Sequence, residues 1–88
     1  MHDHQVISAF WQWFVAREGQ IRILQRPSEP FWDVVLAELR RIHVGLWYEL
    51  SADLAQREFI VTTHGCTELF ALADAVIAAA PRLSGWHF

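Results

Sequence analysis

The sequence predicts an α+β fold: a small, mainly antiparallel, three-stranded sheet with helices packed on one face. Apolar residues recur with the 3.6-residue period of a helix in three segments, 4–17, 28–43 and 67–80. Two other segments, 46–51 and 59–63, have the alternation or the β-branched residues typical of strands. With a last strand beginning at Trp86, the predicted order is α-α-β-β-α-β.

An aromatic run, Phe10-Trp11-Gln12-Trp13-Phe14, marks the first predicted helix, with Asp3 as its N-cap. At 100° per residue its apolar side chains cover an arc of roughly 160°, whereas a helix resting on one surface needs a stripe of about 100°. We therefore expect this helix to pack against two surfaces. The other three aromatics of the run belong in the core, while Trp11 with Val15 points toward something outside the chain.

Turn signals separate the remaining elements. Ser28 is the predicted N-cap of the second helix, with Pro30 in its first turn. The link 52–57 has no glycine, which favours a loose hairpin loop. Pro81 ends the third helix. A right-handed crossover through that helix would bring the last strand beside the first, giving strand order 2-1-3.

Size and composition indicate one domain, residues 1–88, with a single core. The net charge is −3, and the seven basic residues, all arginine, form no cluster, so the sequence does not indicate nucleic-acid binding. A single cysteine and an N-terminus without signal-peptide features favour a cytoplasmic protein. No apolar stretch approaches the roughly 18 residues of a membrane span, so no membrane partner is expected.

The apolar surplus indicates a partner surface. Apolar residues make up 53% of the chain, above the roughly 45–50% typical of soluble domains, and five of them are tryptophan. We expect a homo-oligomer or a complex with another protein. Trp11, Val15 and Trp47 are the predicted interaction residues, because tryptophan is enriched where binding energy concentrates.

The tripeptide His64-Gly65-Cys66 is the best candidate for catalysis. Cys66 falls near the start of the third predicted helix, where backbone N–H groups favour a thiolate, and His64 could act as its base. The alternative is that Cys66 is a small buried apolar residue, as most free cysteines are. No third residue that would orient His64 is identifiable.

No metal site or cofactor is predicted. The pairs His2-x-His4 and His64-x-Cys66 lack the spacing of structural zinc sites, and the sequence has no glycine-rich phosphate loop. Among the scattered acids Glu49 stands out, because it lies on the strand face opposite Tyr48. The simpler interpretation is that this face is solvated.

Several segments resemble a bacterial family of small uncharacterised proteins. They are Phe10-Trp11-Gln12-Trp13-Phe14 with Glu18, then Phe59 to Gly65, Glu68-Leu69-Phe70, and Ala79-Ala80-Pro81-Arg82-Leu83-Ser84-Gly85-Trp86. The resemblance implies no activity and no catalytic residue. Because the family's members look longer, it also implies that this chain is a C-terminally truncated copy or a fragment. At His64 the chain departs from the family's pattern, in which such turns commonly carry an aspartate.

The sequence therefore predicts a small protein that acts through protein–protein interaction or self-association rather than as an enzyme. The alternative is a small enzyme or ligand-binding domain with a tryptophan-lined pocket that uses Cys66 and His64.

Overall fold

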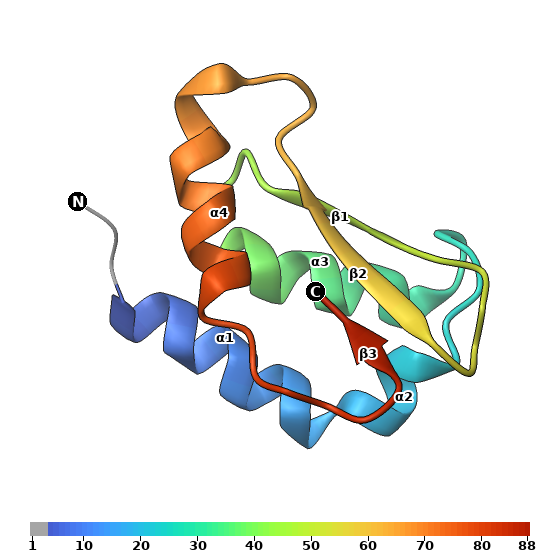
Figure 1. The fold of residues 1–88 in the computed structure, drawn as a ribbon. Coiled ribbons are helices and arrows are strands. Elements are labelled where there is room, and N and C mark those ends of the chain that lie inside the picture. The colour runs from blue at the N-terminus through green and yellow to red at the C-terminus, as the bar shows by residue number, and fades with distance from the viewer. Residues whose placement is uncertain (1–3) are drawn as a thin grey trace.

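The computed structural model describes residues 4–88 and confirms the α+β class and the order of elements (Figure 1). The helices are α1 (His4–Ala16), α2 (Glu18–Arg22), α3 (Pro30–Arg40) and α4 (Phe70–Ala78), and a 3-10 turn, η1 (Thr67–Leu69), leads into α4. The strands are β1 (Trp47–Leu50), β2 (Arg57–Thr62) and β3 (Trp86–His87). The short α2 supplies an additional helical turn after α1.

The helix boundaries differ from the predicted ones at the caps. The predicted N-cap Asp3 lies outside the described residues. At α3 the N-cap is Glu29 rather than Ser28, and its side chain does not cap the helix. The Glu29 carboxylate instead accepts hydrogen bonds from the backbone N–H groups of Gln25 (2.5 Å) and Arg26 (2.9 Å), which holds the loop before the helix.

The sheet is mixed, with strand order β1-β2-β3. β1 and β2 are antiparallel, with Tyr48 opposite Val61, while β3 runs parallel to β2, with Trp86 opposite Arg57. The predicted order 2-1-3 was therefore wrong, and so was the expectation that the chain would return beside β1. Because α4 packs against β2, the chain that leaves this helix returns to the nearer, free edge of β2 (Figure 1).

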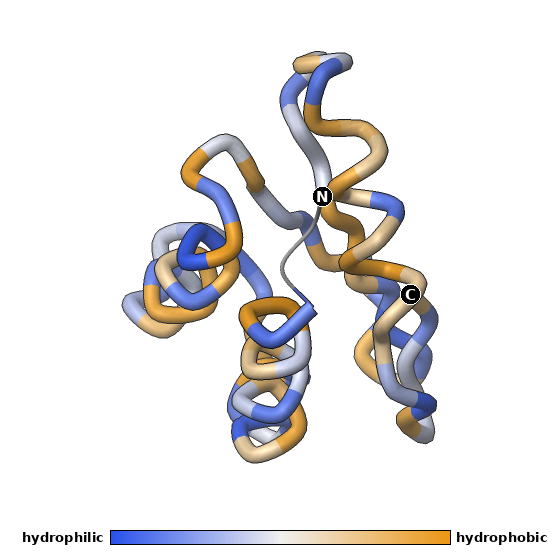
Figure 2. The backbone as a smooth tube through the Cα atoms, turned by 90° about the vertical axis from the view of Figure 1, so that its left-hand side faces the viewer, coloured by the Kyte–Doolittle hydropathy of each residue, from blue (hydrophilic) through white to orange (hydrophobic). Residues whose placement is uncertain are grey.

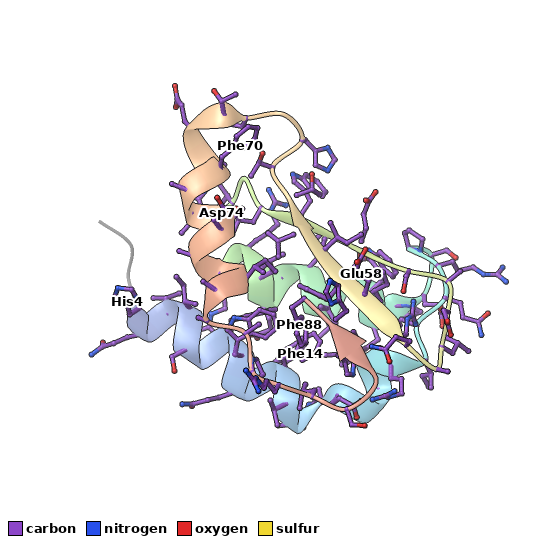
Figure 3. The ribbon with its side chains drawn as sticks, in the orientation of Figure 1. His4, Phe14, Glu58, Phe70, Asp74 and Phe88 are labelled. Carbon is purple, nitrogen blue, oxygen red and sulfur yellow. The ribbon has the colours of Figure 1, made fainter. Side chains whose placement is uncertain are left out.

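Aromatic side chains fill the space between the helices and the inner face of the sheet. Phe14 and Phe59 are fully buried, with their ring centroids 5.2 Å apart, and Phe14 also lies close to Phe88 (Figure 3). Glu49 and Ile60, which face the other way, are exposed. The helices therefore cover one face of the sheet, as predicted. Apolar and polar residues are mixed along α1 and α3, whereas α4 is almost entirely apolar (Figure 2).

A buried arginine of β2 forms hydrogen bonds with the end of α2 and with the loop that follows it. Arg57 is 1% exposed, and its guanidinium donates hydrogen bonds to the carbonyl oxygens of Arg22 (2.7 Å), Leu24 and Ser51. Burial lowers the pKa of Arg57, with the positive charge of Arg22 adding to the effect. Arg57 thus gives a hydrogen-bond partner to the buried carbonyl of Leu24 and to the partly buried carbonyls of Arg22 and Ser51.

Candidate functional site

An apolar groove of about 530 Å³ lies between α1 and the segment that follows α4. Ile7, Trp11 and Val15 form one wall as a row with four-residue spacing. At a rise of 1.5 Å per residue this row is about 12 Å long. Ala79 and Pro81 form the opposite wall. Three polar residues of the groove have the same four-residue spacing along α1, starting with its first residue, which Figure 3 labels: His4, Ser8 and Gln12.

Trp11 takes part in this groove from a buried position. Its side chain is 4% exposed, so the expectation that it points outward was wrong. Its indole N–H donates a hydrogen bond to the carbonyl oxygen of Val76, at 2.8 Å. Val76 lies in the last turn of α4, where helix carbonyls have no partner within the helix, and the indole supplies one. Trp11 therefore joins α1 to α4 and leaves only one edge to the groove.

Val15 has the exposure that the sequence predicts for it. Its side chain is 45% exposed at one end of the apolar row. The described residues of the groove lining include neither a carboxylate nor an arginine. Within residues 4–88 the groove is therefore mainly apolar, and the polar side chains that line it are a histidine, a serine and a glutamine.

Trp47, the third predicted interaction residue, lies elsewhere. It is half-buried at the start of β1, with the Arg40 guanidinium carbon 4.8 Å from its ring centroid and the His64 ring centroid 4.7 Å away. Arginine packed over an indole is a favourable cation–π arrangement. The structure therefore does not bring Trp47 together with Trp11 and Val15.

The candidate catalytic tripeptide forms a tight turn between β2 and η1. His64 and Gly65 both have positive φ angles, of 53° and 84°. Cys66 is the N-cap of η1 and is exposed, so the alternative that it is buried was wrong. The imidazole of His64 contacts Trp47, and across residues 4–88 no hydrogen bond joins it to the Cys66 thiol. The turn thus lacks the hydrogen bond that a Cys–His pair uses for proton transfer.

No group of three or more His, Cys, Asp or Glu side chains converges within residues 4–88. His2, one of the histidines considered for metal binding, lies outside this range. None of the described helices has the length and apolarity of a membrane span.

Sequence reasoning missed two features. One is the second wall of the groove, Ala79 and Pro81, because they come together with α1 only when the chain folds. The other is the buried Arg57. An arginine at an inward position of a strand, in alternation with Phe59, was the available signal, because arginine is rarely buried without partners.

Comparisons of the chain with protein-family models, curated proteins and solved structures give no match. The resemblance to a bacterial family therefore stays a prediction.

Proposed function

We propose that this protein acts through protein–protein contact. Its partner is a second copy of the same chain, bound at the groove between α1 and the segment after α4. The observation that carries the proposal is the apolar row of Ile7, Trp11 and Val15, which is open on one side and ends in the exposed Val15. Grooves of this kind, with apolar walls and few polar groups, are typical of binding sites.

The shape of the groove favours a helix as its occupant. Rows with four-residue spacing form the ridges that pack into the grooves of a neighbouring helix. The wall opposite Trp11 contains Ala79, whose small side chain permits a close approach. In the second copy, the exposed end of the same row, Val15, would enter the groove of the first copy.

The charge of the groove favours a second copy over a charged partner. In a twofold-symmetric dimer each surface meets itself, so charged groups near the axis would face their own kind. Among residues 4–88 the lining has no acidic residue and no arginine, so these parts of two copies can meet without like-charge repulsion. A stable interface buries about 800 Å² per partner, so the contact must extend from the groove onto the exposed surface of α1 or α4.

Sedimentation velocity over a range of concentrations tests the proposal with two matched variants. Val15 and Val34 are both on helices and are 45% and 44% exposed. Val15→Glu should weaken the dimer at least tenfold, because it places two carboxylates in the apolar contact. Val34→Glu, on α3, should leave it unchanged. A wild-type protein that stays monomeric to high micromolar concentration, or equal effects of the two variants, would contradict self-association.

The alternative function, ligand binding in a tryptophan-lined pocket, is also compatible with the groove, because about 530 Å³ is within the range of small-molecule sites. Cys66 and His64 are not in its lining, so this alternative does not include their chemistry. A monomeric protein that binds an apolar fluorescent dye, and loses the dye in Val15→Glu but not in Val34→Glu, would favour it.

A further inference from the structure

Arg57 of β2 is a buried cation that has no carboxylate as a partner. Its side chain is 1% exposed, and its hydrogen bonds go to the backbone carbonyl oxygens of Arg22, Leu24 and Ser51. Among residues 4–88 it forms no ion pair with an aspartate or a glutamate. Because a buried charge is stabilised by an opposite charge beside it, an added anion would bind favourably at this place.

Two of the five N–H groups of the Arg57 guanidinium remain unused. Nη1 donates to the carbonyl oxygens of Arg22 and Leu24, and Nη2 donates to that of Ser51. Nε is buried and has no hydrogen-bond partner in the described part of the chain. The unused donors are therefore the Nε–H and one N–H of Nη2. Arginine binds the two oxygens of a carboxylate through two such parallel hydrogen bonds.

A pocket of about 310 Å³ adjoins Arg57, between the β1–β2 loop and the segment that follows α2 (Figure 1). Its volume is near the lower end of the range of about 300–1,000 Å³ that small-molecule sites have. Within residues 4–88, Arg57 is the only charged residue of the lining. Three apolar residues and two uncharged polar ones complete it: Leu50, Ala52 and Leu54, then Gln25 and Ser51.

The charged groups around the pocket do not already supply the missing anion. The positive charge of Arg22 lowers the pKa of Arg57 and the negative charge of Glu29 raises it, so the two act in opposite directions. The Glu29 carboxylate accepts from two backbone N–H groups of its own loop, and Asp53 does the same in the β1–β2 loop. Glu58, the next residue of β2, points to the opposite face of the sheet.

We propose that this pocket binds a small monocarboxylate with a short apolar chain, whose carboxylate accepts hydrogen bonds from Nε and Nη2 of Arg57. One negative charge matches the single positive charge of the lining. The apolar chain would contact Leu50 and Leu54. A phosphate dianion fits less well, because it brings a second negative charge and offers no contact to these apolar side chains. None of the described residues of this lining also lines the α1 groove, so the proposal does not depend on self-association.

Entry of a carboxylate requires a small movement of the lining, because Nε itself is buried. The β1–β2 loop can provide this movement, since loops are generally more mobile than the strands they connect. Leu54 lies in this loop and is 42% exposed, so its side chain can move without disturbing the core. We therefore expect the ligand to displace residues 51–56 and to leave the pairing of β1 with β2 intact.

NMR of the full chain tests the proposal, because the Nε–H of a buried arginine gives a signal of its own. The probes are butyrate, which has the charge and a short apolar chain, and butyramide, a neutral molecule of nearly the same shape. Butyrate should shift the Nε–H signal of Arg57 with a dissociation constant in the millimolar range, as is typical of so small a ligand. Butyramide and inorganic phosphate should each bind at least tenfold more weakly. The exposed Arg41 is the internal control, and its signals should not shift.

Two matched variants place the same charge inside and outside the pocket. Leu54→Glu puts a carboxylate into the lining, where it competes with the ligand for Arg57, and should weaken butyrate binding at least tenfold. Ala55→Glu adds the same charge one residue further along the loop, outside the lining, and should leave the affinity within twofold. Both positions are exposed, so neither variant should unfold the protein.

Three results would overturn the proposal. The first is no shift of the Arg57 Nε–H signal at tens of millimolar butyrate, which would leave a buried water molecule as the partner of Nε. The second is equal binding of butyrate and either comparison ligand, because the charge or the apolar chain would then contribute nothing. The third is an equal response of Arg41 and Arg57, or an equal effect of the two variants, because butyrate would then be only a non-specific counter-ion.

Discussion

The indole N–H of Trp86 donates a hydrogen bond to Oε1 of Glu18 at 2.8 Å, across 68 residues of sequence. The same carboxylate accepts from Nε of Arg22 at 2.6 Å, and Arg22 also donates to the carbonyl of Ser84 at 2.6 Å. The short α2 and the start of β3 are therefore held together by one charged network.

Replacing Trp86 with phenylalanine should lower the free energy of unfolding by about 1–2 kcal/mol. The variant keeps an aromatic ring but loses the hydrogen bond to a charged group. Urea denaturation at neutral pH measures the change. In a Glu18→Gln background the substitution should cost less, because a neutral amide oxygen accepts a weaker hydrogen bond than a carboxylate. An equal cost in both backgrounds would show that the charge of Glu18 does not strengthen this bond.

The Glu18 network should also add to acid sensitivity. The hydrogen bond from Trp86 lowers the pKa of Glu18 more than partial burial raises it, and Arg22 lowers it further. A carboxyl with a lowered folded-state pKa stabilises the fold above its ordinary value near 4.5, and this contribution is lost as the pH falls through the folded-state pKa. The difference in unfolding free energy between the wild type and Glu18→Gln should therefore shrink between neutral pH and pH ~3. A difference independent of pH would contradict this.

Trp11→Phe should destabilise the fold by about 1–2 kcal/mol, because it leaves the Val76 carbonyl without its indole donor. The matched control is Trp13→Phe. Trp13 is half-buried and stacks on Phe31, with ring centroids 6.2 Å apart. This control should cost less than about 1 kcal/mol. Thermal unfolding followed by circular dichroism gives the comparison, and a larger effect at Trp13 would rule out the assigned role of Trp11.

Arg57→Lys should be among the more damaging conservative changes, at about 2–4 kcal/mol. A lysine ammonium lacks the planar fork with which Arg57 reaches carbonyls of Arg22, Leu24 and Ser51. Arg41→Lys is the control, because the Arg41 side chain is 75% exposed, and its effect should stay within about 0.5 kcal/mol. Similar denaturation midpoints for the two variants would contradict the structural role of Arg57.

Alanine variants of two glycines distinguish the cost of backbone strain from the cost of a steric clash. Gly85 and Gly65 have φ angles of 81° and 84°, which disfavour any residue with a Cβ. At Gly65 a Cβ would meet open space, whereas at Gly85 it would collide with the Arg22 guanidinium. Gly65→Ala should cost about 1 kcal/mol and Gly85→Ala about 2–3 kcal/mol. Chemical denaturation of both variants checks the order, and a reversed order would contradict the packing of Arg22 over Gly85.

The exposed Cys66 allows a direct test of the catalytic alternative. Iodoacetamide should modify Cys66 in the folded protein at the rate of a short peptide with the same local sequence, and His64→Ala should leave this rate unchanged. The reason is that His64 contacts Trp47 rather than the thiol. Alkylation more than tenfold faster than in the peptide, and slowed in His64→Ala, would favour an activated thiolate after all.

Sequence periodicity determined which elements form and which of their faces are apolar. The alternation around Tyr48 and the β-branched run after Phe59 predicted two strands, and both are present. Pro30 lies in the first turn of α3, as expected. These features depend on residues close together in the chain, so the sequence contains the information needed to predict them.

Only the tertiary structure decided the strand order, the direction of Trp11 and the partners of Arg57. Trp11 has both an apolar ring and a polar N–H, and its position on α1 leaves two outcomes open: exposure, or burial with a hydrogen-bond partner. The carbonyl of Val76, 65 residues away, settles the question in favour of burial. In the same way β3 lies beside β2 because α4 packs there. Such contacts join residues that are far apart in the sequence, and no local pattern specifies which partner will be near.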